Sequence, residues 1–316
     1  MAASAPEHDP RVYARLDDLA RLEHKARGFS LLPKQPMHSL LAGRYASRLR
    51  GRGLNFEEIR GYLPGDDVRN MDWKVTARLR KPHVRVYTEE RDRPLMLVVD
   101  QRLSMFFGSR RNMNSVTAAE LAAIAAWRSL GQGDRAGGII FNDERMVDLK
   151  PHRSRRAVLR LLGTVSEMNC ELRADSLLKP NQAMLGQALE KAQQVARHDS
   201  LVVVISTFWG AAETDYEHMK RLSAHNDVIA VQIYDEGQIN LPEAGRAVVS
   251  DGDLQFELDT DQEKHRRSLA DFFEGRTKQI KESLRKVGVP TLLISNAQDS
   301  VEQLRGQLGL IGQRPR

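Results

Sequence analysis

An alternation of apolar runs and amphipathic stretches, which begins at Pro94, is the sequence feature that most constrains the fold. Two of the runs, 95–100 and 201–206, are apolar almost throughout, as is typical of strands buried on both faces of a parallel sheet. Stretches with apolar residues at helical spacing lie between them, near 154–168 and 182–197. Strands that alternate with helices predict a doubly wound, mainly parallel α/β sheet with right-handed crossovers.

The alternation continues to the end of the chain with one interruption, a predicted β insertion near 236–260. Two capping boxes mark predicted helix starts, Thr117 with Glu120 and Thr260 with Glu263, and the second helix should end before Gly288. The remaining predicted elements are strands at 137–141, 145–149, 228–234 and 291–294, a helix near 213–224 and a last helix through 301–308.

The first 92 residues follow a different pattern. Prolines and glycines interrupt the chain repeatedly between Pro33 and Gly65. A short helix is predicted at 11–25 and short strands at 55–59 and 84–87. The predicted parts are therefore an N-terminal helix and partly β region over 1–92 and an α/β domain over 93–316.

Positive charge is concentrated in one segment of the chain. The net charge is +6, and the segment from Arg44 to Arg93 holds 13 Lys/Arg against 8 Asp/Glu, which is nearly all of the excess. Such a segment could bind nucleic acid, an anionic membrane surface or an acidic protein, or it could be a solvated face with local ion pairs.

The cellular compartment is inferred by elimination. Cys170 is the single cysteine, so no disulfide can form within the chain. The N-terminus lacks the apolar stretch of a signal peptide. The longest apolar runs fall far short of the roughly 20 residues that a membrane helix needs. We therefore expect a cytoplasmic protein without a membrane span.

The common enzyme signatures are absent from the sequence. It contains no Gly-x-x-x-x-Gly-Lys-Ser/Thr phosphate loop, no His-Glu-x-x-His and no Gly-x-Ser-x-Gly. The run from Gly131 through Gly133 to Ala136 resembles a dinucleotide fingerprint but follows a helix and precedes a strand, the reverse of what that fingerprint requires. We predict no enzymatic activity and no cofactor.

The most informative candidate site is the end of the first sheet strand. Ligands of open α/β sheets bind at the carboxyl ends of strands, near a topological switch point. Asp100 and the turn 101–104 should lie there, with Ser206 and Thr207 at the end of a neighbouring strand.

One long stretch resembles a known family. Residues 52–78 read RGLNFEEIRGYLPGDDVRNMDWKVTAR, which is similar to the hallmark of the domain-of-unknown-function 58 family. The segments 88–100, 227–235 and 241–245 continue the likeness, so that it covers roughly residues 40–300. The resemblance implies a von Willebrand factor A-like fold. It also implies a MoxR-type AAA+ ATPase as partner, of the kind thought to assist maturation or assembly of other proteins.

The loops depart from the metal site that this resemblance implies. Such a site uses Asp-x-Ser-x-Ser after the first strand, a threonine from a middle loop and an aspartate after a later strand. Here Arg102 replaces the first serine, while Asp100 and Ser104 remain. Thr207 stands where the later aspartate is expected, and the middle loop 182–187 offers no hydroxyl. A guanidinium near Asp100 could substitute for the metal, so we predict a degenerate site that binds no metal.

The family motif offers a second candidate site. Its members could form a buried ion-pair and stacking network or a surface that binds a partner; they are Asp66, Asp67, Arg69, Asp72, Trp73, Lys74 and Arg78.

The prediction that follows for the whole chain is a non-catalytic adaptor or scaffold that works with a MoxR-type ATPase and binds an unknown client protein. The alternatives are a metal-dependent von Willebrand A-type binder and a nucleic-acid binder that uses the basic segment 44–93. Eight interleaved acids and few aromatic residues disfavour nucleic acid.

Overall fold

The chain forms two compact units, which we describe separately. One unit comprises Ala42–Asp92, and the other joins Met1–Leu41 to Arg93–Arg316. The structure is a computed structural model. The residues that it describes are 9–26, 54–89, 93–196, 198–239, 246–250, 255–259 and 261–311.

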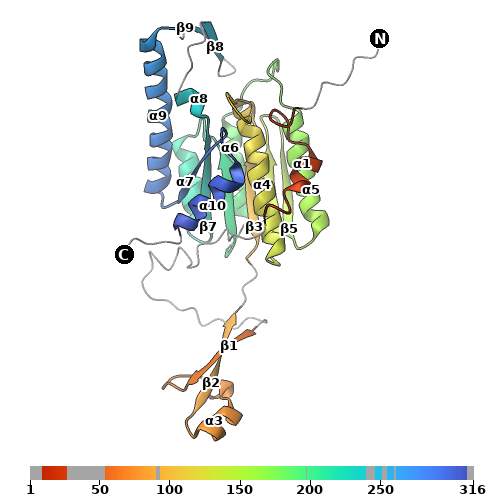
Figure 1. The fold of residues 1–316 in the computed structure, drawn as a ribbon, viewed down its shortest axis with the longest axis vertical. Coiled ribbons are helices and arrows are strands. Elements are labelled where there is room, and N and C mark those ends of the chain that lie inside the picture. The colour runs from red at the N-terminus through yellow and green to blue at the C-terminus, as the bar shows by residue number, and fades with distance from the viewer. Residues whose placement is uncertain are drawn as a thin grey trace. The chain divides into compact units, whose positions relative to one another are not determined.

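The larger unit is built on a six-stranded sheet of order β10-β7-β6-β3-β4-β5 (Figure 1). Its strands are β3 (Leu95–Asp100), β4 (Ala136–Phe141), β5 (Met146–His152), β6 (Leu201–Ser206), β7 (Asp227–Tyr234) and β10 (Thr291–Ser295). All neighbours are parallel except the edge strand β5, which pairs antiparallel with β4. This order confirms the predicted fold class, a doubly wound, mainly parallel α/β sheet.

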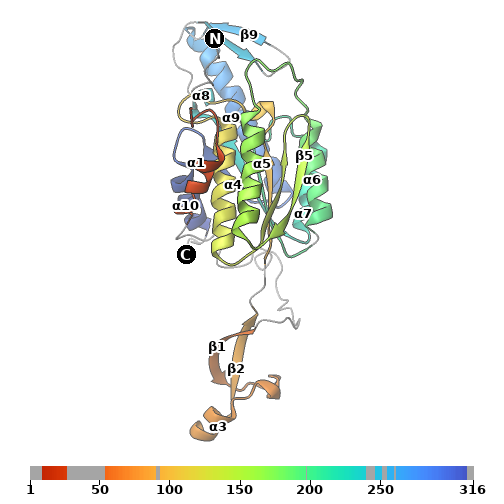
Figure 2. The same cartoon turned by 90° about the vertical axis from the view of Figure 1, so that its right-hand side faces the viewer.

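Two layers of helices cover the two faces of this sheet (Figure 2). One layer contains α1 (Leu16–Arg21), α4 (Asn114–Gly131), α5 (Arg155–Cys170) and α10 (Ser300–Ile311). The other contains α6 (Ala183–Val195), α7 (Glu213–Ser223) and α9 (Glu263–Lys286). Alternate strand residues point to opposite layers, so Leu97 packs with the first and Val98 with the second. Both faces are buried, which explains the continuous apolar runs of β3 and β6.

The predicted insertion is present after β7. It contains α8 (Glu236–Ile239) and an antiparallel pair, β8 (Arg246–Ser250) with β9 (Gln255–Asp259). The predicted stop of the next helix is also correct, because α9 ends at Lys286 and Gly288 adopts a φ of 77°. A φ in this region is one that glycine adopts without steric cost.

The capping box predicted at Thr117 is wrong. Helix α4 begins at Asn114 with Met113 as its N-cap, three residues before Thr117. Thr117 is fully inside the helix, where its amide bonds to the carbonyl of Met113 at 3.0 Å. Helix α9 has Gln262 as its N-cap, and Thr260 lies outside the described residues. A Thr-x-x-Glu pattern is equally compatible with the interior of a buried helix, which is where Thr117 lies in α4.

Helix α1 belongs to the larger unit, whereas the sequence placed it with the rest of residues 1–92. It is also shorter than the predicted 11–25. Leu19 is buried against the first helical layer, and the indole N–H of Trp127 donates to the Leu19 carbonyl at 3.1 Å. A short helix gains most of its stability from such packing, which the sequence pattern did not reveal.

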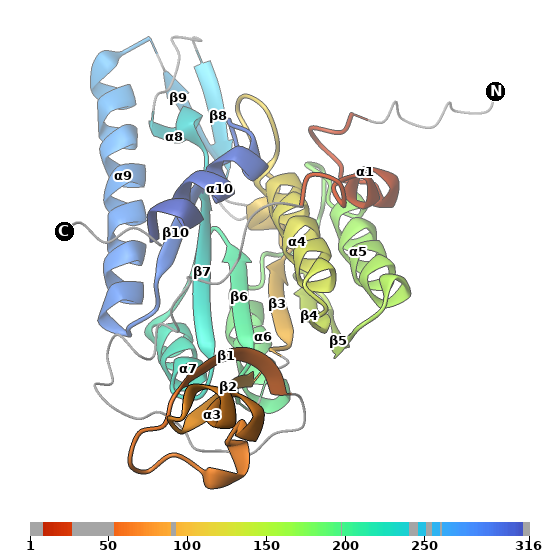
Figure 3. The ribbon, with the colours of Figure 1, turned by 60° about the horizontal axis from the view of Figure 1, so that its bottom comes forward.

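The small unit is an antiparallel ribbon with a helical connection (Figure 3). Its elements are β1 (Leu54–Gly61), η1 (Val68–Asn70), α3 (Trp73–Leu79) and β2 (His83–Glu89). The two strands contain the predicted 55–59 and 84–87, so the small partly β region is confirmed.

Helix α10 closes the edge of the sheet at β10. The amide of Leu293 donates to Oε1 of Gln307 at 3.1 Å, and Nε2 of Gln307 donates to the Leu293 carbonyl. Gln303 pairs in the same way with Ser295, at 2.8 Å for both bonds. Two glutamines spaced i, i+4 on one face of the helix thus satisfy the outward backbone groups of an edge strand.

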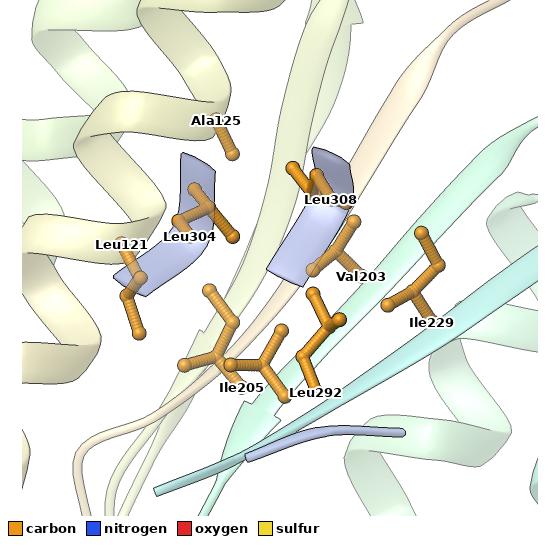
Figure 4. A pocket seen from close by; sticks show the side chains of 9 residues that line it. Leu121, Ala125, Val203, Ile205, Ile229, Leu292, Leu304 and Leu308 are labelled. Carbon is orange, nitrogen blue, oxygen red and sulfur yellow. The ribbon is translucent and has the colours of Figure 1, made fainter. Parts of the chain in front are cut away.

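An apolar cavity of about 20 Å³ lies between α10 and the sheet (Figure 4). Leu304 and Leu308 of α10, Val203 of β6 and Ala125 of α4 are among its lining residues. A space of this size could hold one water molecule, but the lining is apolar, and water requires polar partners. The cavity is therefore a dry packing defect under the last helix.

Candidate functional site

The candidate site lies where β3 and β6 end, at the switch point of the sheet. The side chain of Asp100 meets the guanidinium of Arg102, with Nε to Oδ1 at 3.0 Å and Nη2 to Oδ2 at 2.7 Å. The Arg102 amide also donates to Oδ1 at 3.0 Å, and the hydroxyl of Ser206 donates to Oδ2 at 2.6 Å. The structure thus places a fixed cation against the carboxylate.

This ion pair is almost completely removed from solvent. The side chains of Arg102 and Asp100 are 2% and 0% exposed. Burial lowers the pKa of the Arg102 guanidinium, but the charge and hydrogen bonds of Asp100 outweigh burial and raise that pKa. The guanidinium also lies 5.7 Å from the ring centroid of Phe141. Arg102 is therefore permanently charged and has no direct access to a ligand in solution.

The rest of the guanidinium faces the neighbouring loops. Its Nη1 donates to the Gln182 carbonyl at 3.4 Å and its Nη2 to the Trp209 carbonyl at 3.5 Å. These carbonyls belong to the segment before α6 and the segment after β6. Phe208, between Ser206 and Trp209, is buried with a φ of 54°, a region that a bulky residue rarely adopts. Arg102 therefore ties together loops from three places in the sequence.

Asp143 adds a second connection between the same loops. Its Oδ2 accepts from the Leu103 amide at 2.6 Å, and its Oδ1 accepts from the Asn181 amide at 2.7 Å. The sequence analysis did not single out this residue. The sequence did offer a signal, because Asp143 is a carboxylate in the loop that follows the parallel strand β4, just as Asp100 lies at the end of β3.

A second polar cluster lies at the ends of β7 and β10, and sequence reasoning missed it too. Asp235 is buried; its Oδ1 accepts from the Ser109 hydroxyl at 2.6 Å and the Gly237 amide at 2.7 Å. Its Oδ2 accepts from the Ser109 amide at 2.8 Å and from Nδ2 of Asn296 at 2.7 Å. A side chain at position 237 would place its Cβ 2.0 Å from the Ser109 hydroxyl, so only glycine fits there. This cluster fixes the long loop that follows β3.

The residues present do not fit the divalent metal that the family resemblance suggests. A carboxylate offers about four acceptor positions, and the four bonds to Asp100 occupy them. A magnesium ion needs near-octahedral oxygen ligands, and it would lie beside a buried guanidinium here. Across the described ranges, no group of three or more His, Cys, Asp or Glu side chains is arranged to hold a metal.

The other two predicted loop residues contribute in different ways. The hydroxyl of Ser104 is buried and has no hydrogen-bond partner among the described residues. The hydroxyl of Thr207 accepts from the Trp209 amide at 3.3 Å, and its own amide faces the sulfur of Met105 at 3.3 Å. Thr207 therefore shapes the turn after β6.

Apolar side chains remain exposed on the segments beside this site. Trp209, Phe272 and Phe273 form an aromatic cluster with ring centroids 5.5 to 6.2 Å apart, and Arg276 lies 5.9 Å from the Trp209 ring. Phe272 is 55% exposed. Leu177, in the segment that ends at the tethered Asn181, is fully exposed.

In the small unit, the acidic residues of the family motif make local bonds. Asp66 forms a two-bond pair with Arg60, both distances 2.8 Å. Asp72 accepts from the Lys74 and Val75 amides at the start of α3 and pairs with Arg85 at 2.8 Å. The Asp67 carboxylate accepts from the Arg69 amide at 3.0 Å.

The other members of the motif lie on the surface. Trp73 is 68% exposed, and the side chains of Arg69, Lys74 and Arg78 are exposed as well. The predicted residues of the motif thus divide into carboxylates that organise the unit and an exposed set of one aromatic and three basic side chains.

Comparison with known proteins identifies the family. The model described as "Protein of unknown function DUF58" matches residues 58–280. The chain belongs to this family, which confirms the resemblance predicted from the sequence. The chain is also similar to Uncharacterized protein Rv1480 of Mycobacterium tuberculosis and Uncharacterized protein Mb1516 of Mycobacterium bovis. Each is 28% identical over 304 residues, which cover 94% of this chain and 92% of the relative.

Two solved structures show distant similarity. One is the conserved hypothetical protein BatB from Bacteroides thetaiotaomicron, with 12% identity, a TM-score of 0.35 and coverage of 62% of this chain and 98% of that chain. The other is the SpRpn10 VWA domain, with 13% identity, a TM-score of 0.35 and coverage of 71% and 98%. Among the described residues, no helix combines the length and apolar character needed to span a bilayer.

Proposed function

We propose that this chain is a non-catalytic adaptor whose larger unit binds a client protein without a metal, in partnership with a MoxR-type AAA+ ATPase. The observation that supports metal-independent binding is the buried pair of Arg102 and Asp100. In a metal-dependent binder, a ligand carboxylate completes the coordination of an exposed ion. Here the cation is part of the protein and is 2% exposed, so a client carboxylate cannot contact it.

The client surface in this proposal is the rim of loops at the strand ends. Leu177 and Phe272 are exposed there, Phe272 packs against the half-buried Trp209, and exposed apolar side chains are typical of protein-binding sites. Arg102 and Asp143 hold these loops in one arrangement, which reduces the entropy lost when a client binds.

The ATPase supplies what the sequence of this chain lacks, a phosphate loop that binds nucleotide. The proposed division of labour is that the ATPase provides energy and this chain provides client recognition. A cytoplasmic location is part of the same proposal and fits the single Cys170. The metal-dependent alternative is disfavoured by the occupied carboxylate, and the nucleic-acid alternative by the carboxylates interleaved in the basic segment.

Two measurements test the proposal. Calorimetric titration with Mg²⁺ and Mn²⁺ should give no binding at micromolar concentrations, and micromolar binding would restore the metal-dependent alternative. The purified MoxR-type ATPase of the same organism should form a complex with the full chain, and excess EDTA should leave its affinity unchanged in the absence of nucleotide. A consistent lack of complex formation would overturn the ATPase partnership.

A further inference from the structure

The small unit exposes several large apolar side chains that its own fold does not bury. Leu63, Val68, Trp73 and Leu79 are 60%, 58%, 68% and 50% exposed. A single exposed leucine is ordinary in a soluble protein. Several large apolar side chains on one ribbon with a short helix, including a tryptophan, are instead typical of an interaction surface.

Basic side chains accompany these apolar ones over residues 68–81. Arg69, Lys74, Arg78, Arg80 and Lys81 are all exposed in this segment. Its only acidic residue is Asp72, whose carboxylate caps α3 and pairs with Arg85. The pKa of Asp72 is lowered by hydrogen bonds from the Val75 amide and from Arg85, so this carboxylate stays ionised within the fold. The surface presented by 68–81 is therefore positive as well as apolar.

The backbone at the end of α3 favours the same conclusion. Arg80 is the C-cap residue and has a φ of 56°, where glycine is the usual choice and other residues incur steric strain. An arginine stands there in place of the glycine that would relieve the strain. It extends the row of cations beyond the last turn of the helix.

We propose that the segment 68–81, which we call the α3 face, is the docking surface for an acidic protein partner with an apolar centre. This inference rests on the proposed function and assigns the α3 face to the ATPase and the loop rim of the larger unit to the client. Tryptophan and arginine are the residues most often found at the energetic centres of protein interfaces. Complementary charge on the partner would speed association and set its orientation.

The arrangement fits a protein better than a membrane surface or a nucleic acid. Trp73 and Leu79 are six positions apart, which places them about 120° from each other around the helix, and two exposed apolar side chains give α3 little area to bury in a bilayer interface. Its seven residues are also few for such a helix. For a nucleic acid, the face provides a single aromatic side chain for base stacking, and the carboxylates of Asp66 and Asp67 lie next to it in sequence.

A matched pair of charge-reversal variants tests this inference in the full chain. Lys74→Glu with Arg78→Glu reverses two exposed cations spaced i, i+4 on α3. Lys281→Glu with Arg285→Glu makes the same change at the same spacing on the exposed side of α9. Affinity for the purified MoxR-type ATPase is measured over a range of salt concentrations. We expect the α3 variant to bind at least about tenfold more weakly and with a flatter salt dependence, and the α9 variant to bind like the wild type.

Additional variants and probes distinguish a failure of this inference from a failure of the proposed function. Trp73→Ala should weaken ATPase binding while Trp73→Phe retains most of it, and circular dichroism should show unchanged folding for both. Equal ATPase binding by the wild type and the α3 variant would overturn this inference and leave the proposed function standing. No ATPase binding by the wild type would overturn both. If the α3 variant binds the ATPase like the wild type but loses binding to phosphatidylserine vesicles or duplex DNA, the face would be assigned to a membrane or a nucleic acid instead.

Discussion

Each of the two units contains an ion pair between an arginine and an aspartate, and the two pairs lie in different environments. In the larger unit, Arg102 contacts both carboxylate oxygens of Asp100, and the side chains are 2% and 0% exposed. In the small unit, Arg60 contacts both carboxylate oxygens of Asp66, and the side chains are 37% and 20% exposed. Each pair is joined by two hydrogen bonds, through Nε and Nη2 of Arg102 and through Nη1 and Nη2 of Arg60, and the two pairs differ strongly in burial. A buried pair becomes costly to break because the partner left behind is an unpaired charge out of water.

The difference also separates the roles of the two units. At the strand ends of the larger unit, Arg102, Asp143 and Asp235 make hydrogen bonds within the protein that tie the loops to one another. The small unit uses its carboxylates to form a turn and a helix cap, and it leaves Trp73 and the cations Arg69, Lys74 and Arg78 exposed to solvent. The first arrangement stabilises a shape, whereas the second leaves charged and apolar groups available to a partner.

The largest expected effect comes from breaking the buried pair. Arg102→Met should destabilise the larger unit by about 3–5 kcal/mol, because the buried Asp100 would be left without its partner. The same change releases the Gln182 and Trp209 carbonyls from the guanidinium. Urea unfolding followed by far-ultraviolet circular dichroism measures the loss.

The control for this prediction removes the charge as well. The double variant Asp100→Asn, Arg102→Met leaves no unpaired charge, so it should be more stable than Arg102→Met alone. If the single variant loses less than about 1 kcal/mol, the buried pair behaves like a surface pair and the comparison between the units fails.

A moderate effect is expected at the one cavity described in the larger unit. Val203→Ile adds a methylene group on the side of β6 that lines this cavity and should stabilise the unit by up to about 0.8 kcal/mol. Val204→Ile makes the same addition on the opposite face, in the second core cluster, and should cost about 1–3 kcal/mol through overpacking. Thermal unfolding of the two variants provides the measurement, and equal shifts would show that the defect under α10 cannot accept a side chain.

The smallest effect is expected at the exposed pair. Hydrogen bonds from Arg60 and from the Leu63 amide lower the pKa of Asp66. A carboxylate whose pKa is lower in the folded state than in the unfolded state stabilises the fold. This contribution is fully present above the pKa of the unfolded state, about 3.9, and is lost as the pH falls through the pKa of the folded state. Asp66→Asn should therefore increase amide hydrogen exchange in β1 and β2 slightly near neutral pH. The difference from the wild type should shrink in acid and in high salt, unlike that of the Arg102 variant.

Much of the fold could be predicted from the sequence because its strands are buried on both faces. Runs such as 95–100 and 201–206 have few alternatives to a central parallel strand. The starts of helices were harder to predict. Helix α4, for example, begins at Asn114, three residues before the capping box that Thr117 suggested. Helix α1 depends on contacts with Trp127, more than 100 positions away, which no local pattern indicates.

The candidate site could also be predicted only in part from the sequence. The replacement of a serine by Arg102 is visible in a single loop, so the degenerate site could be proposed before its geometry was known. Spacing could not connect Asp143 to this site, nor Asp235 and Asn296 to each other in the second cluster, since their partners come from distant loops. A systematic search for polar residues within two positions after parallel strands would have found all three. The exposure of Trp73 could not have been inferred, because a tryptophan beside acids and cations is equally compatible with internal stacking.

The pairing of α10 with β10 has a practical consequence for shortened forms of the chain. Gln303 and Gln307 occupy hydrogen-bonding groups that another β-strand could otherwise use. A chain cut before Ser300 would present a bare edge beside the apolar residues that now line the cavity. Such a fragment is expected to grow by edge-to-edge addition and to precipitate. Helix α10 therefore protects the β10 edge of the sheet from pairing with a further strand.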